Sequence, residues 1–591
     1  MIDLARLRLR AGELVEDLRE REDRLALVLS LVIGAVVGLV VVAFILVTGR
    51  IASHLYPPGG SGIGRIVVPV VGSLVSGFLL VKYFPNARGS GIPQTRAALF
   101  IHDGIISLRT VAGKFICCSI SLASGISLGR EGPSVQIGAG VASVIAQRVG
   151  LSREQIKWLV PVGGAAALAA AFNTPIAAVL FSLEEITGDL HTPIIGSVVL
   201  SSATAWIVLH LFLGDNPLFH VTPYHLVNPA ELLIYALLGV VGGFVSVMFV
   251  RLLLRLREKF ANLPGSTLWV QPMVGGLTVG IMAYFVPDVL GVGYDVVERV
   301  LGGNVVLRVV LLLAILKLIA TAVCYASGNA GGIFGPSLFL GAMVGAVVGS
   351  AAHTLLPDMT AGPGAYALVG MGAAFAGIIR TPMTSVIMIF EVTRDYSIIV
   401  PLMIANLLAF YISQRMQKES IYEALARQDG LHLPRHASET RATIRPVTLA
   451  IREAPSPLDH RMSVADAALL IEDSSLASWP VSDADGLTGM VRASDIRDAV
   501  TAHPAWTLSE LIFNRSTDDD HLAHVHTDHP LSLALSRMGS SGHDVLPVVS
   551  RANGRILLGI VTLKDVLRAF GVEKSKRTSE FRAPPFTSGS S

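Results

Sequence analysis

Long runs of hydrophobic positions dominate the first two thirds of this chain and indicate helices that cross a membrane. Such runs cover Leu25 to Val47, Leu232 to Val250, Val305 to Val323 and Val400 to Ile412. Several of them reach the roughly 20 residues that a helix needs to span a bilayer. Beyond about residue 430 the pattern changes to the ordinary alternation of apolar and polar positions found in soluble domains.

Other apolar segments are short and are interrupted by glycine or proline. The clearest examples are Ile92 to Ile101 and Val160 to Leu183. Short, broken hydrophobic segments are typical of transporter helices that stop near the middle of the membrane and line a binding site. We therefore expect a site inside the membrane-spanning part.

The composition supports a membrane protein. Of the 591 residues, 52% are hydrophobic and 15% are charged, whereas soluble domains carry about 25% charged residues. The net charge of +2 gives no reason to expect a nucleic-acid partner. Cys117, Cys118 and Cys324 lie in apolar segments. Their spacing matches neither a metal site nor a disulfide scaffold, so we expect packing roles and no bound metal.

The first 24 residues mix both signs of charge and lack the apolar core and cleavage site of a signal peptide. We interpret them as an amphipathic helix on the cytoplasmic face, where arginine is favoured, and expect both termini in the cytoplasm. Residues 25–430 form the predicted membrane part. Two soluble α/β repeats follow at 440–502 and 503–572, and the Ser/Pro-rich residues 573–591 are predicted to be disordered.

The membrane part contains an internal repeat, with halves at about 25–215 and 230–430. Three pairs of blocks keep their order at a nearly constant offset: "GREGPS" (129–134) with "GIFGPS" (332–337), "GGAAALAAAFNTPIAAVLFSLEE" (163–185) with "GMGAAFAGIIRTPMTSVIMIFE" (370–391), and "YFPNARGSG" (83–91) with "YFVPDVLGVG" (284–293). Such halves usually pack about a pseudo-two-fold axis, with the site at their junction. The sequence does not determine whether the two halves have the same orientation in the membrane or opposite orientations.

Three glycine- and proline-rich turns are placed to open helices, at 89–93, 129–133 and 331–336. The first turn of a helix has unpaired N–H groups that, with the helix dipole, attract an anion. Glycine allows close approach, and proline is tolerated in a first turn. Three such openings could converge on one dehydrated anion.

Glu131 lies within the second opening. As an ionised carboxylate it can occupy an anion site itself, and as a neutral acid it can leave, which would make it both a gate and a proton carrier. The alternative is a structural Arg130–Glu131 pair that caps a turn.

These motifs resemble the signatures of the CLC family of chloride channels and proton-coupled chloride transporters, present here as GSGIP, GREGP and GIFGP. An isolated tyrosine of the family is matched by Tyr422 in "ESIYEAL". The resemblance covers about residues 25–430. It implies an all-α polytopic membrane protein with an inverted-repeat bundle, a homodimer with one pathway per subunit, and chloride and protons as the transported ions.

The resemblance also implies roles for single residues. Ser90 and Tyr422 would offer hydroxyls to the central chloride, Ile333 and Phe334 would offer backbone N–H groups, and Glu131 would be the external gating glutamate. In the family, serine at the position of Ser90 suits chloride. The anion-binding set is completed by Gly91, Ile92 and Gly132. Outside the family context Ser90 could be a turn residue and Tyr422 an interfacial anchor.

Two further acids follow in "FSLEEITGD". Glu184 aligns with Glu391 in the repeat, so we interpret both as structural, through capping or pairing. Glu185 has no repeat partner. In transporters of the family an acid at this position relays protons from the inside, whereas many channels carry an apolar residue. The alternative is a solvated glutamate at a cytoplasmic helix end.

The chain departs from some transporters of the family just after GSGIP. Gln94 and Arg96 stand where some of them carry acids, while Lys114 is retained. These departures leave the electrostatic network near the external side undetermined, whereas the anion site itself is unaffected.

The C-terminal part resembles a tandem pair of CBS domains, each copy reading helix, strand, turn, strand, helix. The copies end on Gly489 to Asp495 and on Gly559 to Asp565. Thr562 and Asp565 keep a pattern that can bind a ribose, whereas Arg492 breaks it in the first copy. An adenine nucleotide and a purely structural pair are both compatible with this pattern.

We therefore predict a transporter, not an enzyme, that exchanges chloride for protons in a bacterial inner membrane without a required cofactor. A passive voltage- or pH-gated chloride channel of the same family is the alternative. CBS pairs also accompany zinc metalloproteases, but the HExxH motif that these need is absent. They accompany magnesium transporters as well, and these need acidic residues along a cation path.

Overall fold

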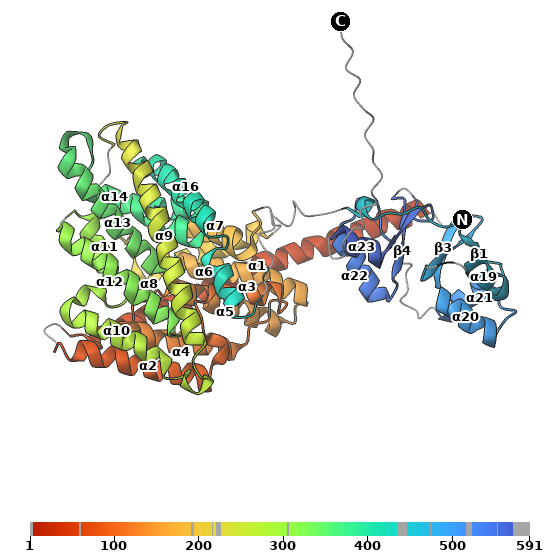
Figure 1. Cartoon of the computed structure of the whole chain (residues 1–591), viewed down its shortest axis with the longest axis horizontal. Helices are drawn as coiled ribbons and strands as arrows, with labels where there is room; N and C mark the ends of the chain where they lie inside the picture. The colour runs from red at the N-terminus through yellow and green to blue at the C-terminus, as the bar shows by residue number, and fades with distance from the viewer. Residues whose placement is uncertain are drawn as a thin grey trace, which may run out of the picture. The chain divides into compact units, whose positions relative to one another are not determined.

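The computed structural model describes residues 4–57, 61–190, 194–215, 217–219, 221, 226–303, 306–431, 433, 446–472, 474, 476–515, 523–551 and 553–570. It divides into two compact units, Met1–Ala437 and Ser438–Ser591 (Figure 1). The division lies close to the change in composition near residue 430. The tail predicted at 573–591 lies outside the described residues.

The first unit is built from helices. In chain order they are α1 (Leu4–Leu55), α2 (Gly64–Lys82), η1 (Pro85–Ala87), α3 (Ile92–Phe100), α4 (Leu108–Ala123), α5 (Glu131–Val149), α6 (Arg153–Phe172), α7 (Pro175–Phe181), η2 (Ser182–Thr187), α8 (Ile195–Leu213), α9 (Glu231–Ala261), η3 (Gly265–Thr267), α10 (Gln271–Phe285), η4 (Pro287–Val289), α11 (Tyr294–Leu301), α12 (Leu307–Ala326), α13 (Phe334–Leu355), η5 (Pro357–Met359), α14 (Pro363–Ile379), α15 (Pro382–Thr393), η6 (Tyr396–Ile398), α16 (Ile399–Met416) and α17 (Ile421–Gln428).

Eight helical segments among the described residues are long and apolar enough to cross a membrane. Large apolar side chains such as Leu233 and Phe285 point outward and stay exposed, as expected for surfaces that face lipid. The helix predicted for the N-terminal segment continues without a break into the first span, because α1 runs from Leu4 to Leu55.

The two halves of the first unit contact each other symmetrically through two glutamates. Glu184 accepts hydrogen bonds from the backbone N–H (2.9 Å) and the hydroxyl (2.7 Å) of Thr384 in the first turn of α15. Glu391, near the end of α15, accepts from the N–H groups of Ile176 (3.0 Å) and Ala177 (2.6 Å) in the first turn of α7. The capping role predicted for Glu184 and Glu391 is thus confirmed.

Such an exchange of equivalent contacts is what a two-fold relation produces. Each glutamate lies toward the C-terminal end of its own segment and caps the N-terminus of the other helix, so α7 and α15 run antiparallel. Because α7 and α15 are equivalent helices of the repeat, the rotation that superposes one half on the other reverses the direction of its helices. The halves therefore form an inverted repeat.

Two buried lysines follow the same symmetry. Lys114, in α4, donates to the carbonyls of Ala87 (3.1 Å) and Gly89 (2.6 Å) in the loop before α3. Lys317, in α12, makes the matching bonds, also 3.1 and 2.6 Å, to the loop before α11. Both lysines are buried. Each charge is solvated by carbonyl dipoles, and each lysine fixes a loop from which a short helix starts.

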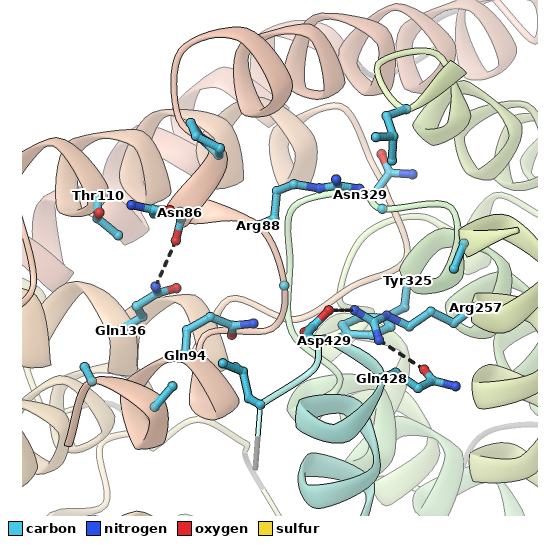
Figure 2. A pocket seen from close by; sticks show the side chains of 18 of the residues that line it. Asn86, Arg88, Gln94, Thr110, Gln136, Arg257, Tyr325, Asn329, Gln428 and Asp429 are labelled. Atoms are coloured by element: carbon cyan, nitrogen blue, oxygen red, sulfur yellow. Dashed lines mark hydrogen bonds and ion pairs between the residues drawn. The ribbon is translucent and has the colours of Figure 1, made fainter. Parts of the chain in front are cut away.

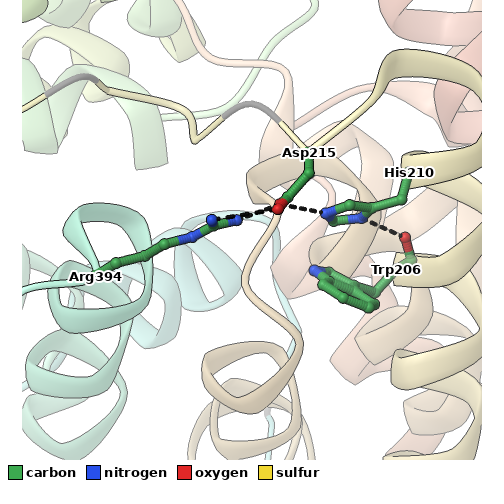
Figure 3. A network of polar contacts seen from close by, with 4 residues as sticks. All are labelled: Trp206, His210, Asp215 and Arg394. Atoms are coloured by element: carbon green, nitrogen blue, oxygen red, sulfur yellow. Dashed lines mark hydrogen bonds and ion pairs between the residues drawn. The ribbon is translucent and has the colours of Figure 1, made fainter.

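An exposed cluster joins the ends of α8 and α15 (Figure 3). Asp215 pairs with Arg394, which ends α15, and lies 2.9 Å from Nε2 of His210. Hydrogen bonds from Arg394 and then His210 lower the pKa of Asp215 to about 2. Asp215 therefore stays ionised until the pH falls toward that value, although exposed pairs of this kind contribute little to stability.

The second unit contains two copies of a helix–strand–strand–helix motif, as predicted. The elements of the first copy are β1 (Leu458–Asp459), α19 (Val464–Ile471), β2 (Ser478–Asp483), β3 (Gly486–Arg492) and α20 (Ala493–Ala502). The next helix, α21 (Leu508–Arg515), falls within the predicted bounds of the second copy, but its Leu508 and Leu511 pack in the core of the first. The elements of the second copy are α22 (Leu531–Ser541), β4 (Val545–Val549), β5 (Leu557–Thr562) and α23 (Leu563–Ala569). Strands pair antiparallel within each copy, with β1 added parallel to β2.

The capping glutamates generate a stability prediction. We expect Glu184→Ala and Glu391→Ala to lower the free energy of unfolding by similar amounts, about 1–3 kcal/mol each, because each leaves buried N–H groups without an acceptor. Thermal unfolding in detergent, with Asp215→Ala as the exposed control, measures this. Two capping variants as stable as the control would show that the caps do not hold the halves together.

Candidate anion-binding site

The two halves are joined at their glycine-rich turns. Gly129 donates its N–H to the carbonyl of Gly332, and Gly332 donates back to Gly129, both at 2.7 Å. These residues are equivalent in the repeat, so the contact is again symmetric. It places the first turn of α5 beside the first turn of α13.

The start of α3 packs onto the same point. Gly91 has a φ of +106°, and a Cβ there would lie 2.2 Å from the carbonyl oxygen of Gly132. A Cβ on Gly132 would lie 2.5 Å from the carbonyl oxygen of Ser90. Glycine is therefore required on both sides of this contact. The three helix openings identified in the sequence meet, and α3, α5 and α13 begin at the junction of the halves.

Two buried hydroxyls accompany these helix ends. Among the described residues, Tyr422 Oη has no hydrogen-bond partner, and Ser90 contacts Tyr325. Ser90 directly precedes the α3 opening. Tyr422 lies in the first turn of α17, which packs against α3, and Glu131 is among its electrostatic neighbours. Ile92, Ile333 and Phe334 are fully buried at the starts of α3 and α13. Hydroxyl and N–H donors gathered at helix N-termini suit a small anion.

Glu131 starts α5 and is fully buried. Its Oε2 accepts from the N–H of Gly335 (3.2 Å), in the first turn of α13, and its Oε1 accepts from the hydroxyl of Tyr294. Arg130 instead lies over the ring of Tyr294, 5.5 Å from its centre. The carboxyl group thus lies at a helix N-terminus of the other half, an arrangement different from the Arg130–Glu131 pair considered as the alternative.

Tyr294 was not predicted as part of the site. It follows "GVG" in the repeat block that answers "GSG", so its equivalent in the first half is Ile92. Alignment of the repeats was the signal that could have found it.

Glu185 lies in η2, a π-helical turn, a feature frequent at functional sites. Its Oε1 accepts from Nη1 of Arg96 at 2.9 Å, and both side chains are 1% exposed. The alternative of a solvated glutamate is therefore wrong. Arg96, which stands where some transporters of the family carry an acid, is therefore the ion-pair partner of Glu185. The other carboxylate oxygen of Glu185 has no partner within the described part of the chain.

A cavity of about 1200 Å³ is lined by Arg88 and Gly89, the residues just before Ser90 (Figure 2). Tyr325 lines this cavity and interacts with Ser90. Arg257 in its wall is paired with Asp429 and with Gln428 (3.0 Å). Arg88, two residues before Ser90, lines the same cavity, and the acid that acts on it, Asp429, is already paired with Arg257.

In the second unit, Thr562 and Asp565 form the N-terminal cap of α23. The hydroxyl of Thr562 donates to Asp565 (2.6 Å), and the N–H of Asp565 donates back (3.2 Å). Arg452 and Arg568 also contact the carboxylate, which is 7% exposed. A ribose would have to displace one of these partners, and nucleotide binding here stays a prediction.

The chain matches the family described as "Voltage gated chloride channel" over residues 71–414 and the CBS domain over residues 518–572. It is 32% identical to the H(+)/Cl(−) exchange transporter ClcA of Citrobacter koseri, over 72% of this chain and 94% of that protein. It is 35% identical to a ClcB-like chloride channel protein of Ralstonia nicotianae, over 63% of this chain and 88% of that one.

Two solved structures share the fold. A slow cyanobacterial Cl⁻/H⁺ antiporter gives a TM-score of 0.64 at 26% identity, covering 68% of this chain and 97% of its own. A eukaryotic CLC transporter gives a TM-score of 0.61 at 22% identity, covering 91% of this chain and 97% of its own.

The cavity generates a prediction about anion entry. We expect Arg88→Gln to raise the half-saturating anion concentration on the cavity side roughly two- to tenfold, because a cation in the cavity wall raises the local anion concentration. Flux measured against anion concentration on each side tests this. Arg427→Gln is the control, since Arg427 also lines the cavity but pairs with Glu419 at 2.8 Å. Equal effects of the two variants would exclude a specific role for Arg88.

Proposed function

Because this chain belongs to the voltage-gated chloride channel family and is an integral membrane protein, we propose that it exchanges chloride for protons across that membrane. The observation that carries the proposal is the position of Glu131, whose carboxylate accepts the N–H of Gly335 at the start of α13. A titratable anion at an anion site can compete with chloride and carry a proton. The relative named as an H(+)/Cl(−) exchange transporter supports the same function.

Chloride binding follows from the donors at the junction. A dehydrated anion would bind the hydroxyls of Ser90 and Tyr422 and the N–H groups of Ile333 and Phe334. Gly91, Ile92 and Gly132 shape the opposite wall, where glycine lets the backbones approach closely. Neutral dipoles stabilise the ion without the tight trapping that a full positive charge would cause.

Glu131 gates this site through its charge. The ionised carboxylate takes the helix N-terminus of α13 and excludes chloride from it. The protonated carboxyl is a weaker acceptor and leaves, so chloride enters as a proton is held. Because the Glu131 carboxylate and chloride replace each other at the N-terminus of α13, chloride movement is coupled to proton movement.

Glu185 binds the proton on the inner part of its route. Its ion pair with Arg96 links this protonation to the anion site. When Glu185 takes up a proton, the buried charge of Arg96 loses its partner. A buried unpaired cation is costly, and Arg96 lies in α3, the helix that opens at Ser90. Protonation of Glu185 therefore favours chloride at the neighbouring opening. Glu185 lies in a π-helical turn, so its backbone differs from that of the regular α-helix before it.

The alternative is a passive chloride channel of the same family, in which Arg96 keeps Glu185 permanently ionised and no proton follows the anion. A magnesium transporter has no support from family membership. We further propose a homodimer with a pathway in each subunit, in a bacterial cell membrane with both termini in the cytoplasm. An adenine nucleotide at Thr562 and Asp565 would be a regulator of transport, not a required cofactor.

Glu131→Gln tests the gate. Glutamine keeps the size of the protonated acid and cannot ionise, so we expect chloride flux to persist while its pH dependence and its coupling to protons disappear. Chloride and proton fluxes recorded together from liposomes measure both.

Glu231→Gln is the matched control. Glu231 is also buried and accepts from a backbone N–H, that of Ala361 (2.8 Å), and from a tyrosine, Tyr235 (3.2 Å), away from the site. Proton coupling that survives Glu131→Gln, or that is lost equally in Glu231→Gln, would remove Glu131 from the mechanism.

Glu185→Val tests the proposed proton site at Glu185. We expect chloride-driven proton movement to vanish and chloride movement to remain largely intact, because chloride reaches the site through its own donors. Valine leaves Arg96 unpaired, which costs about 3–5 kcal/mol of stability, so Glu185→Gln, which still accepts from Arg96, is the companion variant. If Glu185→Gln pumps protons at the wild-type rate, the proton takes another route.

A further inference from the structure

Tyr294 is the one polar side chain that reaches the gating carboxylate from the opposite half, among the described residues. It starts α11, after Gly293. The repeat equivalent of this helix start is Ile92 at the start of α3, where the sequence reads GSG-Ile instead of GVG-Tyr. The second half thus has a helix opening that presents a phenol where the first half presents an apolar side chain.

The surroundings of Tyr294 hold its hydroxyl on Glu131. Phe219 packs edge-on against the ring, with centroids 5.7 Å apart, and Arg130 lies over it. A Cβ on Gly335 would lie 3.2 Å from the phenol oxygen and 3.1 Å from Oε2 of Glu131. The phenol, the carboxylate and the N–H of Gly335 therefore form one compact cluster, and each carboxylate oxygen has its own donor.

We propose that Tyr294 is a latch for the gate, a positioning residue that stabilises the ionised carboxylate of Glu131 in the anion site. This inference rests on the proposed role of Glu131. A hydrogen bond from a phenol to an ionised carboxylate is stronger than one to a neutral carboxyl group. The latch therefore favours the closed, ionised gate and weakens when Glu131 is protonated. Chloride entering the site has to compete with a carboxylate held by two donors.

Removing the phenol changes chloride binding in a defined way. Tyr294→Phe keeps the ring that contacts Phe219 and Arg130 and deletes the hydroxyl alone. With the ionised carboxylate held less tightly, we expect chloride to bind roughly tenfold more tightly at neutral pH, as judged by the typical strength of a charge-assisted hydrogen bond. Calorimetric titration of the full-length protein in detergent with sodium chloride measures this.

A double-mutant cycle separates a latch from a general structural effect. In the Glu131→Gln background there is no charged carboxylate to hold, so Tyr294→Phe should change chloride affinity by less than about twofold. Tyr235→Phe is the matched control, because Tyr235 donates to Glu231 in the same manner away from the site. It should leave chloride affinity at the wild-type value.

Two results would overturn the latch. One is unchanged chloride affinity in Tyr294→Phe, and the other is an equal effect of Tyr294→Phe with and without the Glu131 carboxylate. Wild-type protein that moves chloride without protons would instead contradict the proposed exchange. The latch is measured by chloride binding alone, so the two failures are distinguishable.

Discussion

The structure depends on the paired hydrogen bonds between Gly129 and Gly332, which join the two halves where three helices begin. A bare anion in the membrane interior needs donors, and a helix N-terminus supplies them without a counter-charge. The first half contributes the N-termini of α3 and α5, and the second half contributes that of α13. The three helix N-termini come together only where the halves meet. The glycines keep this junction tight, because a side chain at Gly91 or Gly132 would collide with the neighbouring backbone.

The inverted repeat divides the residues into two kinds. Positions that keep the symmetry are structural: Lys114 and Lys317 fix equivalent loops, while Glu184 and Glu391 cap each other's helices. The positions proposed to act on ions break the symmetry: Glu131 corresponds to Phe334, Ser90 to Val292, and Ile92 to Tyr294, while Glu185 has no acidic counterpart. A symmetric scaffold with asymmetric side chains gives the pathway two different ends, which a coupled exchange requires.

Much of this arrangement follows from local sequence. Glycine and proline at fixed offsets mark helix openings, and the internal repeat predicts that equivalent openings meet, so the surroundings of Glu131 and the caps at Glu184 and Glu391 were predictable. The contacts of Tyr294 and Arg96 were not. Arg96 reaches Glu185 across 89 positions and Tyr294 reaches Glu131 across 163, and no local pattern encodes such distances.

Chloride-driven proton movement by the wild-type protein tests the central claim most directly. Liposomes containing the protein are loaded with high chloride and diluted into low chloride at equal pH, and the external pH is recorded. The account predicts that chloride leaving the liposomes drives protons inward, so that the external medium becomes alkaline until a proton ionophore abolishes the change. A potassium ionophore is present throughout, because chloride leaving and protons entering both make the interior more positive. Chloride efflux under these conditions with no change in external pH would contradict the account.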